Sequence, residues 1–392
     1  MIISWTTYTT TQASIAQLLD TDTTYVSKKE WVVAAVDSLM TQKLNASMEL
    51  EVFHAILKSS RHKKSNDPLA DDLLSSLANH PQLGKWTMHR LSCKEAVTVP
   101  FLVCMIDVVK SNARAADPIL AFLASHVDMI CLLWQAEHIT VVRRSLELVK
   151  RLLATYHTPA FCHHVLAGLA NYVEHLRQHL LPHHIQILTA SDRTEFFYEP
   201  VCDNLTVDRE CIKQLIQITL TLLSLLPNES WHWLASIPNF QAEDDDEVSL
   251  PDILFDFYSN DEDAVELQHA ILLLYTNQAD ALHDWMDEIG VTPHTMFLHF
   301  LDRTGMEASM LIDLLISNET DFLAFFVVYL KHIQSNPNAF MHTCIQLFGD
   351  DGPSILVSKI LHPLLPVLTS AGFPYNASVL VHRIRDILSF ME

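Results

Sequence analysis

Glycine is scarce in this chain. Among 392 residues there are only 7 glycines: Gly84, Gly168, Gly290, Gly305, Gly349, Gly352 and Gly372. Sheet-rich folds and nucleotide-binding folds use glycine at turns and phosphate loops, and average proteins contain about 7% of it. The spacings present here fit neither G-x-G-x-x-G nor G-x-x-x-x-G-K-[ST]. A helical chain is therefore predicted, and the two nucleotide folds that carry these motifs are excluded.

Apolar residues recur at helical spacing almost throughout, for example Val32, Val36 and Leu39. Breaks such as Thr158-Pro159 and Asn336-Pro337 separate segments of about 10–20 residues. The length exceeds the roughly 250–300 residues that one core accommodates. We therefore expect an all-α fold, an irregular α-solenoid of armadillo- or HEAT-like helix pairs with about eight or nine degenerate units.

Two gaps interrupt the helical pattern. The acidic run Glu243-Asp244-Asp245-Asp246-Glu247 predicts a linker or loop over 239–250, between N-terminal helical repeats in 1–238 and C-terminal helical repeats in 251–392. The other gap alternates at Ile185-Gln186-Ile187-Leu188 and continues to Phe196-Phe197-Tyr198. A short strand or an ordered loop is expected there, near 184–198.

Composition limits the partners and the compartment. With 25 Lys+Arg against 47 Asp+Glu the formal net charge is −22, the wrong sign for direct nucleic-acid binding. The 7 cysteines form no C-x-x-C pair and fit reduced core thiols, which indicates the cytoplasm or the nucleus. No signal peptide is recognised at the start, and the apolar runs are too short to span a bilayer. No membrane partner is therefore expected.

Histidines form the richest group of potential metal ligands: Cys162, His163, His164, His175, His179, His183 and His184. His175 and His179 are four residues apart, so on a helix they share a face and could offer two imidazoles to zinc, with His163 or His184 as a third ligand. However, the intervening sequence lacks the glutamate of H-E-x-x-H. A solvated helix face is the favoured interpretation, with no metal, no cofactor and no catalytic residue; a zinc-dependent hydrolase is the alternative.

A second pattern is the four-residue spacing of Arg143, Glu147 and Arg151, with Arg144 and Lys150 beside them. Such spacing predicts an exposed ion-pair ladder on one helix face. A basic docking strip is the alternative interpretation.

The most unusual feature concerns charge. From Gln214 to Asp302, 89 residues contain no Lys or Arg and 17 Asp or Glu. Asp261-Glu262-Asp263 is expected at a helix start, where negative charge complements the helix dipole. Such an acidic surface either serves solubility or attracts a partner with a Lys/Arg-rich segment. The candidate partner-binding residues are Asp244, Asp245, Asp246, Asp261 and Asp263.

The segment from Met310 to Lys331 predicts a capped, buried helix. Asn318 can cap it with Asp321 at the third helical position, and Glu319 adds charge at its start. The rear of this helix is expected to be apolar as well. The broad apolar stripe on its main face consists of Phe322, Phe325, Phe326, Tyr329, Leu330 and Ile333. Near the C-terminus, Phe373-Pro374-Tyr375-Asn376 predicts a turn whose aromatic rings dock against the last helix.

These two motifs resemble the Lines family of developmental regulators. The resemblance covers roughly 250–335 and 372–392, and its motif residues are Ser317, Asn318, Glu319, Thr320 and Phe322, followed by Phe373, Pro374, Tyr375 and Asn376. It implies a non-catalytic protein-binding scaffold that regulates transcription or developmental, Wnt-linked signalling through bound partners, such as a transcription regulator. A transport-receptor-like adaptor is a further alternative.

Overall fold

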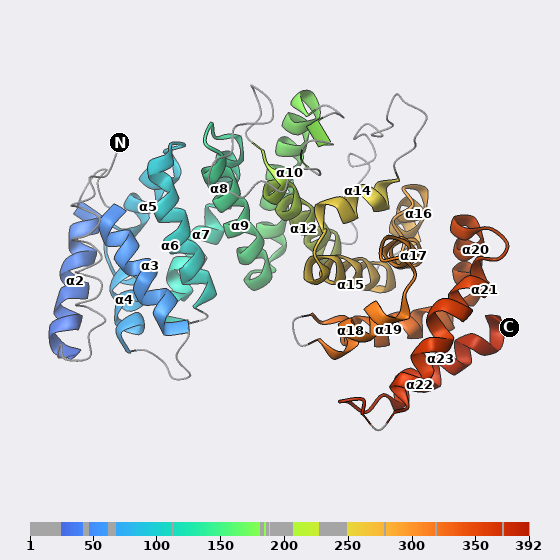
Figure 1. The fold of residues 1–392 in the computed structure, drawn as a ribbon. Coiled ribbons are helices and arrows are strands. Elements are labelled where there is room, and N and C mark those ends of the chain that lie inside the picture. The colour runs from blue at the N-terminus through green and yellow to red at the C-terminus, as the bar shows by residue number, and fades with distance from the viewer. Residues whose placement is uncertain are drawn as a thin grey trace. The chain divides into compact units, whose positions relative to one another are not determined.

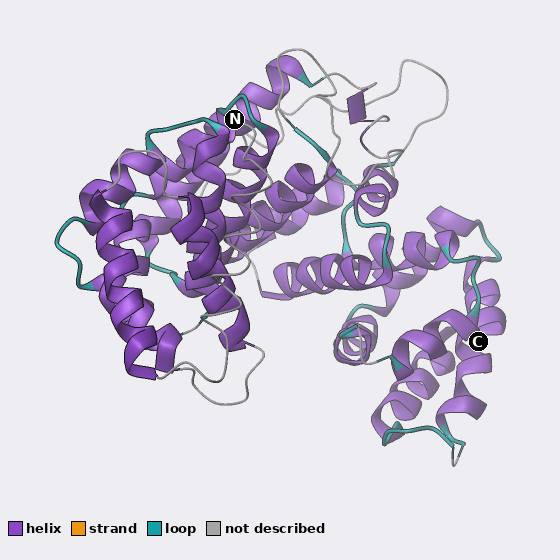
Figure 2. Cartoon of the chain, turned by 60° about the vertical axis from the view of Figure 1, so that its left-hand side comes forward, coloured by secondary structure: helices purple, strands orange, loops and turns teal. Residues whose placement is uncertain are grey.

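The computed structural model describes residues 25–41, 47–61, 68–111, 113–180, 184–185, 188, 207–226, 249–277, 280–317, 320–370 and 372–391. Within these ranges the chain consists of helices and their connections, and no strand is present (Figure 2). The described helices divide into two compact units, α2–α12 and α14–α23 (Figure 1). The all-α prediction is confirmed for this part of the chain.

The first unit is built from helices of 5 to 21 residues. They are α2 (Tyr25–Thr41), α3 (Ser47–Arg61), α4 (Pro68–Ala78), α5 (Leu83–Leu91), α6 (Val99–Lys110), α7 (Asp117–Ser125), α8 (Val127–Cys131), α9 (Ile139–Thr155), α10 (Pro159–His179) and α12 (Arg209–Leu225). Short 3-10 turns precede α6 and α7 and follow α8. Helix α10 starts at one of the predicted breaks. Thr158 caps it by accepting a hydrogen bond from Phe161 N, and Pro159 occupies its first turn.

Four helices of the first unit pack in series. α3 packs against α6, α6 against α9, and α9 against α12. The core side of α9 is largely apolar, with Val142, Leu146, Val149 and Leu153 at 0% exposure. Hydrophobic burial of this kind supplies most of the stability of a helix stack. The four helices α3, α6, α9 and α12 are called the helix ladder below.

Gly168 permits a close approach between α10 and α8. A Cβ at this position would lie 2.6 Å from Cys131 Cβ, closer than real Cβ contacts. Any larger residue would therefore force α10 away from α8, and the glycine is required by packing.

The second unit contains α14 (Leu250–Phe257), α15 (Asp261–Asn277), α16 (Asp280–Glu288), α17 (Pro293–Arg303), α18 (Ala308–Ile316), α19 (Phe322–Ser335), α20 (Pro337–Phe348), α21 (Gly352–Leu356), α22 (His362–Leu368) and α23 (Ser378–Met391). A π-helical turn, Val357–Leu361, joins α21 to α22. α19 packs against α15, α18 and α23, which makes it the central helix of this unit.

An aromatic cluster surrounds α19. The rings of Phe322 and Phe326 stack at 5.4 Å between centroids, and Tyr329 lies 4.4 Å from Phe297 of α17. The predicted stripe is confirmed, since all six of its residues are at most 2% exposed. The rear of the helix is half-buried.

The predicted cap of α19 is wrong. The helix begins at Phe322 with Asp321 as the N-cap residue, and the side chain of Asp321 makes no capping hydrogen bond. Asp321 therefore precedes the helix and does not occupy its third position. Asn318 and Glu319 lie outside the described residues.

Several predictions concern residues that the structure does not describe. Of the proposed linker over 239–250, only Ser249 and Leu250 are described, and most of the segment near 184–198 is outside the described ranges. The domain division and the short strand therefore stay predictions. No single described helix is long and apolar enough to cross a bilayer; Arg114–Ser125 and Val127–Gln135 meet the length and composition of a span only together, across a 69° bend.

Candidate functional site

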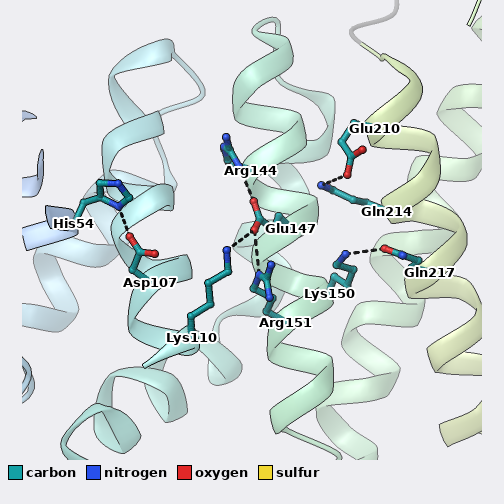
Figure 3. Close-up of polar contacts among 10 residues, drawn as sticks. All are labelled: His54, Asp107, Lys110, Arg144, Glu147, Lys150, Arg151, Glu210, Gln214 and Gln217. Carbon is teal, nitrogen blue, oxygen red and sulfur yellow. Dashed lines mark hydrogen bonds and ion pairs between the residues drawn. The ribbon is translucent and has the colours of Figure 1, made fainter. Parts of the chain in front are cut away.

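Glu147 of α9 is the centre of a charged cluster on the helix ladder (Figure 3). Its Oε2 accepts a hydrogen bond from Arg144 Nη1 at 2.7 Å, and its Oε1 accepts one from Arg151 Nε at 3.0 Å. Lys110 at the end of α6 places its Nζ 3.2 Å from the same Oε1. One carboxylate is therefore shared by three cations from two adjacent helices.

Glu147 is ionised at neutral pH. Burial by itself would raise the pKa of Glu147, but the hydrogen bonds from Arg144 and Arg151 and the positive charge of Lys110 outweigh burial and lower this pKa to about 2. Glu147 is consequently ionised, and with Lys110, Arg144 and Arg151 it forms a group whose net charge is +2 (three cations, one anion). This sign is opposite to that of the whole chain, −22.

Other polar contacts join the remaining helices of the ladder. Lys150 Nζ of α9 donates to Gln217 Oε1 of α12 at 2.7 Å, and His54 Nδ1 of α3 contacts Asp107 Oδ2 of α6. Figure 3 shows these side chains following one another from α3 to α12. Each of these contacts connects two neighbouring helices, so the polar row helps to fix the positions of α3, α6, α9 and α12 relative to one another.

The predicted exposed ion-pair ladder is wrong in two respects. Arg143 and Glu147 are buried, at 8% and 7% exposure. Arg143 does not pair with Glu147: its Nη2 contacts Asp208, the N-cap residue of α12. The four-residue spacing along α9 does pair Glu147 with Arg151. Arg143 instead pairs with Asp208, which lies 65 residues away in the chain.

The histidine group divides into separate places. His175 and His179 share a face of α10 as predicted, with ring centroids 4.6 Å apart. His163 lies 12 residues before His175 on the same helix, which corresponds to about 18 Å at 1.5 Å per residue. His163 is exposed and its Nδ1 contacts Pro159 O at 2.6 Å. Within the described ranges, no three His, Cys, Asp or Glu side chains are grouped to hold a metal.

The described cysteines are free thiols, and most of them are buried. Burial raises the pKa of Cys344 to about 12, and burial also raises the pKa of Cys162. These thiols stay protonated at neutral pH, so they are unsuited to nucleophilic attack.

The described acidic candidates lie at the start of α15. Asp261 is exposed and Asp263 is half-buried, both in the first turn, as predicted. Asn260 Oδ1 accepts from Asp263 N at 2.8 Å, and Asn260 Nδ2 donates to Asp263 Oδ2 at 2.6 Å. Asp263 therefore stabilises the helix start in addition to its charge. Asp244, Asp245 and Asp246 lie outside the described residues.

Further carboxylates extend the negative charge of the second unit. Those exposed on α15, α16 and α17 are Asp261, Glu262, Glu266, Asp284, Asp287, Glu288 and Asp302. The cation on these helices is Arg303 of α17, whose Nη2 contacts Asp256 Oδ1 of α14 at 2.6 Å. The seven exposed carboxylates are called the acidic face below.

The two motifs differ in their surroundings. Phe322 is fully buried, and Ser317 ends α18 as its C-cap residue. Thr320 is half-buried between α18 and α19. The first motif is therefore structural where it is described.

The predicted docking of the second motif against the last helix is wrong for Tyr375. Tyr375 is 40% exposed and Pro374 and Asn376 are exposed, whereas Phe373 is half-buried with its ring 6.2 Å from that of Tyr375. The aromatic rings contact each other within the turn, so the turn does not bury Tyr375 against α23. Asn376 instead accepts from Ser378 N at 3.1 Å, at the start of α23.

A buried histidine pair in the second unit has no counterpart in the sequence analysis. His294 of α17 and His332 of α19 have ring centroids 4.9 Å apart and are 4% and 9% exposed. Burial, followed by the proximity of His332, lowers the pKa of His294 to about 3. The two residues are 38 positions apart, so only the packing of α17 near α19 brings them together.

The described residues define an all-helical protein with two compact units. A buried ion pair, Arg143 with Asp208, joins two of its helices, and a basic cluster surrounds Glu147 in the first unit. Exposed carboxylates lie on α15, α16 and α17 of the second unit. A family profile described as Lines N-terminus matches residues 204–344, a range that includes the first motif. The resemblance to the Lines family is therefore confirmed over this part of the chain.

Curated relatives match over short segments. Protein Lines homolog 1 of Homo sapiens is 46% identical over 57 residues, 14% of this chain and 8% of the relative. Protein Lines homolog 1 of Mus musculus is 29% identical over 121 residues, 31% of this chain and 15% of the relative. Protein lines of Drosophila melanogaster is 31% identical over 108 residues, 26% of this chain and 12% of the relative. The chain thus covers a small part of the length of each relative.

Proposed function

We propose that this chain is a non-catalytic, solenoid-like protein-binding scaffold that regulates transcription or developmental, Wnt-linked signalling through its partners, in the cytoplasm, the nucleus or both. The similarity of residues 204–344 to the Lines family supports a regulatory role. The partner is a protein with a Lys/Arg-rich segment, such as a transcription regulator. Binding the basic DNA-contacting segment of such a regulator would also keep it from DNA.

The observation that carries this proposal is the acidic face. Its carboxylates come from three helices of one unit, and Arg303 is the cation on those helices. Charges of one sign on a surface raise the association rate of an oppositely charged partner. The acidic residues of 243–247 add to the same stretch of sequence.

The groups that could support catalysis are engaged otherwise. Glu147, Asp107 and Asp208 contact cations or histidine of neighbouring helices. A hollow on the first unit is lined by Asp117, Pro118, Leu120, Ala121, Thr155 and Tyr156, which do not form a nucleophile and base pair. These observations favour the scaffold over the zinc-dependent hydrolase.

The test uses a fluorescently labelled peptide of ten residues, rich in Lys and Arg. Changing Asp244, Asp245, Asp246, Asp261 and Asp263 to Asn is expected to slow its association with the chain. The effect is expected to shrink as salt rises, because exposed charges are screened over about 8 Å at physiological ionic strength.

A matched control removes five exposed carboxylates of the first unit, by changing Glu30, Glu51, Glu95, Asp128 and Glu137 to the corresponding amides. This control removes the same number of negative charges. Its association rate should therefore differ from that of the parent only by the effect of the total charge. Identical association rates for the parent and the Asn variant would overturn the acidic face as a binding surface.

A further inference from the structure

The helix ladder carries a positively charged surface that the family and the acidic face do not account for. Lys110, Arg144 and Arg151 come from α6 and α9, which pack side by side, and all three converge on Glu147 (Figure 3). Their side chains are 28%, 36% and 34% exposed. Each of these side chains is therefore partly exposed to solvent as well as in contact with Glu147. These three residues are called the basic strip below.

The charge of the basic strip is only partly neutralised. Glu147 is the acidic member of the cluster and its side chain is 10% exposed, so a ligand meets the cations first. A Lys carries three donors and an Arg five, and Glu147 has two oxygens to share among them. Donors remain for carboxylates of a second molecule.

We infer that the basic strip binds an acidic, extended segment of a partner protein, laid across α6 and α9 with its carboxylates on Lys110, Arg144 and Arg151. The strip belongs to the first unit and the acidic face to the second, so this site is additional to the proposed function and does not depend on it.

The ladder geometry sets the ligand. Packed helices lie about 8–10 Å apart, and an extended chain advances about 3.3 Å per residue, so roughly three residues pass from one helix to the next. A segment of about six residues reaches from α6 across α9. Lys150 and Gln217 continue the polar row toward α12.

Nucleic acid is a poorer ligand for this surface. Duplex binding rests on several phosphate contacts and the counterions that they release. The basic strip with Glu147 carries two net positive charges, which are too few to supply that term. A short acidic peptide carries few charges and can be held by three cations.

The probe is a fluorescently labelled, end-capped peptide of ten residues containing five glutamates, titrated with the full chain at low and physiological salt. We expect saturable binding that weakens as salt rises. Changing Lys110→Gln together with Arg151→Gln should lower the affinity about three- to tenfold, the effect of two exposed charge contacts. Lys110→Arg with Arg151→Lys should keep the parent affinity.

Two further variants distinguish a site from general electrostatics. Lys85→Gln with Lys94→Gln removes the same charge from exposed positions elsewhere in the first unit and should leave the affinity unchanged. Lys110→Gln, Arg151→Gln and Glu147→Gln together remove the carboxylate and two of its three partners, so no buried charge is left without a cation. This variant should still lose the peptide.

Three outcomes would overturn the inference. They are the absence of saturable binding, an equal loss for the Lys85 and Lys94 control, and equally tight binding of a ten-nucleotide single strand in place of the peptide. Binding of the Lys/Arg-rich peptide to the acidic face should be unchanged by the basic-strip variants. The two sites therefore succeed or fail separately.

Discussion

Arg143 on α9 and Asp208, the N-cap residue of α12, form a buried ion pair between residues 65 positions apart in the chain. The other oxygen of Asp208 accepts a hydrogen bond from Cys211 N at 2.8 Å, within the first turn of α12. One carboxylate therefore caps a helix and attaches it to its neighbour. The position of α12 on the helix ladder depends on this residue.

Removing one partner of this pair should destabilise the first unit strongly. Arg143→Met leaves the Asp208 carboxylate buried without its cation, which is expected to cost about 3–5 kcal/mol of unfolding free energy. Arg143→Met with Asp208→Asn should recover part of this loss, because the amide oxygen still caps α12. Urea denaturation followed by circular dichroism measures both. The control is Arg177→Met, at an exposed pair with Glu174, which should leave the curve unchanged.

Phe326→Ala tests the aromatic core of the second unit. Phe326 is 1% exposed and stacks on Phe322, so truncation leaves a cavity that is expected to cost about 3–5 kcal/mol. Ile316→Ala is the control, since Ile316 is 41% exposed. An unchanged melting temperature and soluble yield for Phe326→Ala would mean that α19 is not core.

Some of these features can be predicted from the sequence, and others cannot. Helix starts marked by Thr158-Pro159 and Asp261 follow from local chemistry, and so does the stripe of α19. The partner of Arg143 does not, because Asp208 is brought to it by packing. The family resemblance identified both motifs, but it could not predict that Tyr375 stays exposed, since that depends on how the turn meets α23.

The buried histidine pair predicts a loss of stability in mild acid. Burial lowers the folded-state pKa of His294 to about 3, whereas the ordinary value is 6.5. The unfolded chain therefore binds a proton at this position as pH falls below about 6.5, and the folded chain does not until about pH 3. Stability contributed by neutral His294 is fully present above that range and is lost progressively on acidification.

His294→Phe should flatten the dependence of unfolding free energy on pH between neutral and mildly acidic conditions. Some slope should remain, because burial also lowers the pKa of His332. Denaturation midpoints of the parent and the variant measured across this range provide the comparison. Parallel curves would show that His294 titrates alike in the folded and unfolded chains.

Elemental analysis addresses the hydrolase alternative. His175 and His179 are paired, but the exposed His163 lies about 18 Å along the helix at 1.5 Å rise per residue. We expect the purified chain to contain no stoichiometric zinc. We also expect the His175→Ala variant and the parent to have the same melting temperature when a chelator is present. Zinc at one equivalent, lost in His175→Ala, would support the metal-dependent hydrolase instead.

Affinity purification with mass spectrometry tests the scaffold account most directly. The parent chain and the variant with Asn at Asp244, Asp245, Asp246, Asp261 and Asp263 are purified in parallel from the same cells. We predict that the parent retains proteins with Lys/Arg-rich segments, among them transcription regulators, and that these are depleted from the variant while its melting temperature is preserved. The same proteins recovered in equal amounts with both chains would contradict the account.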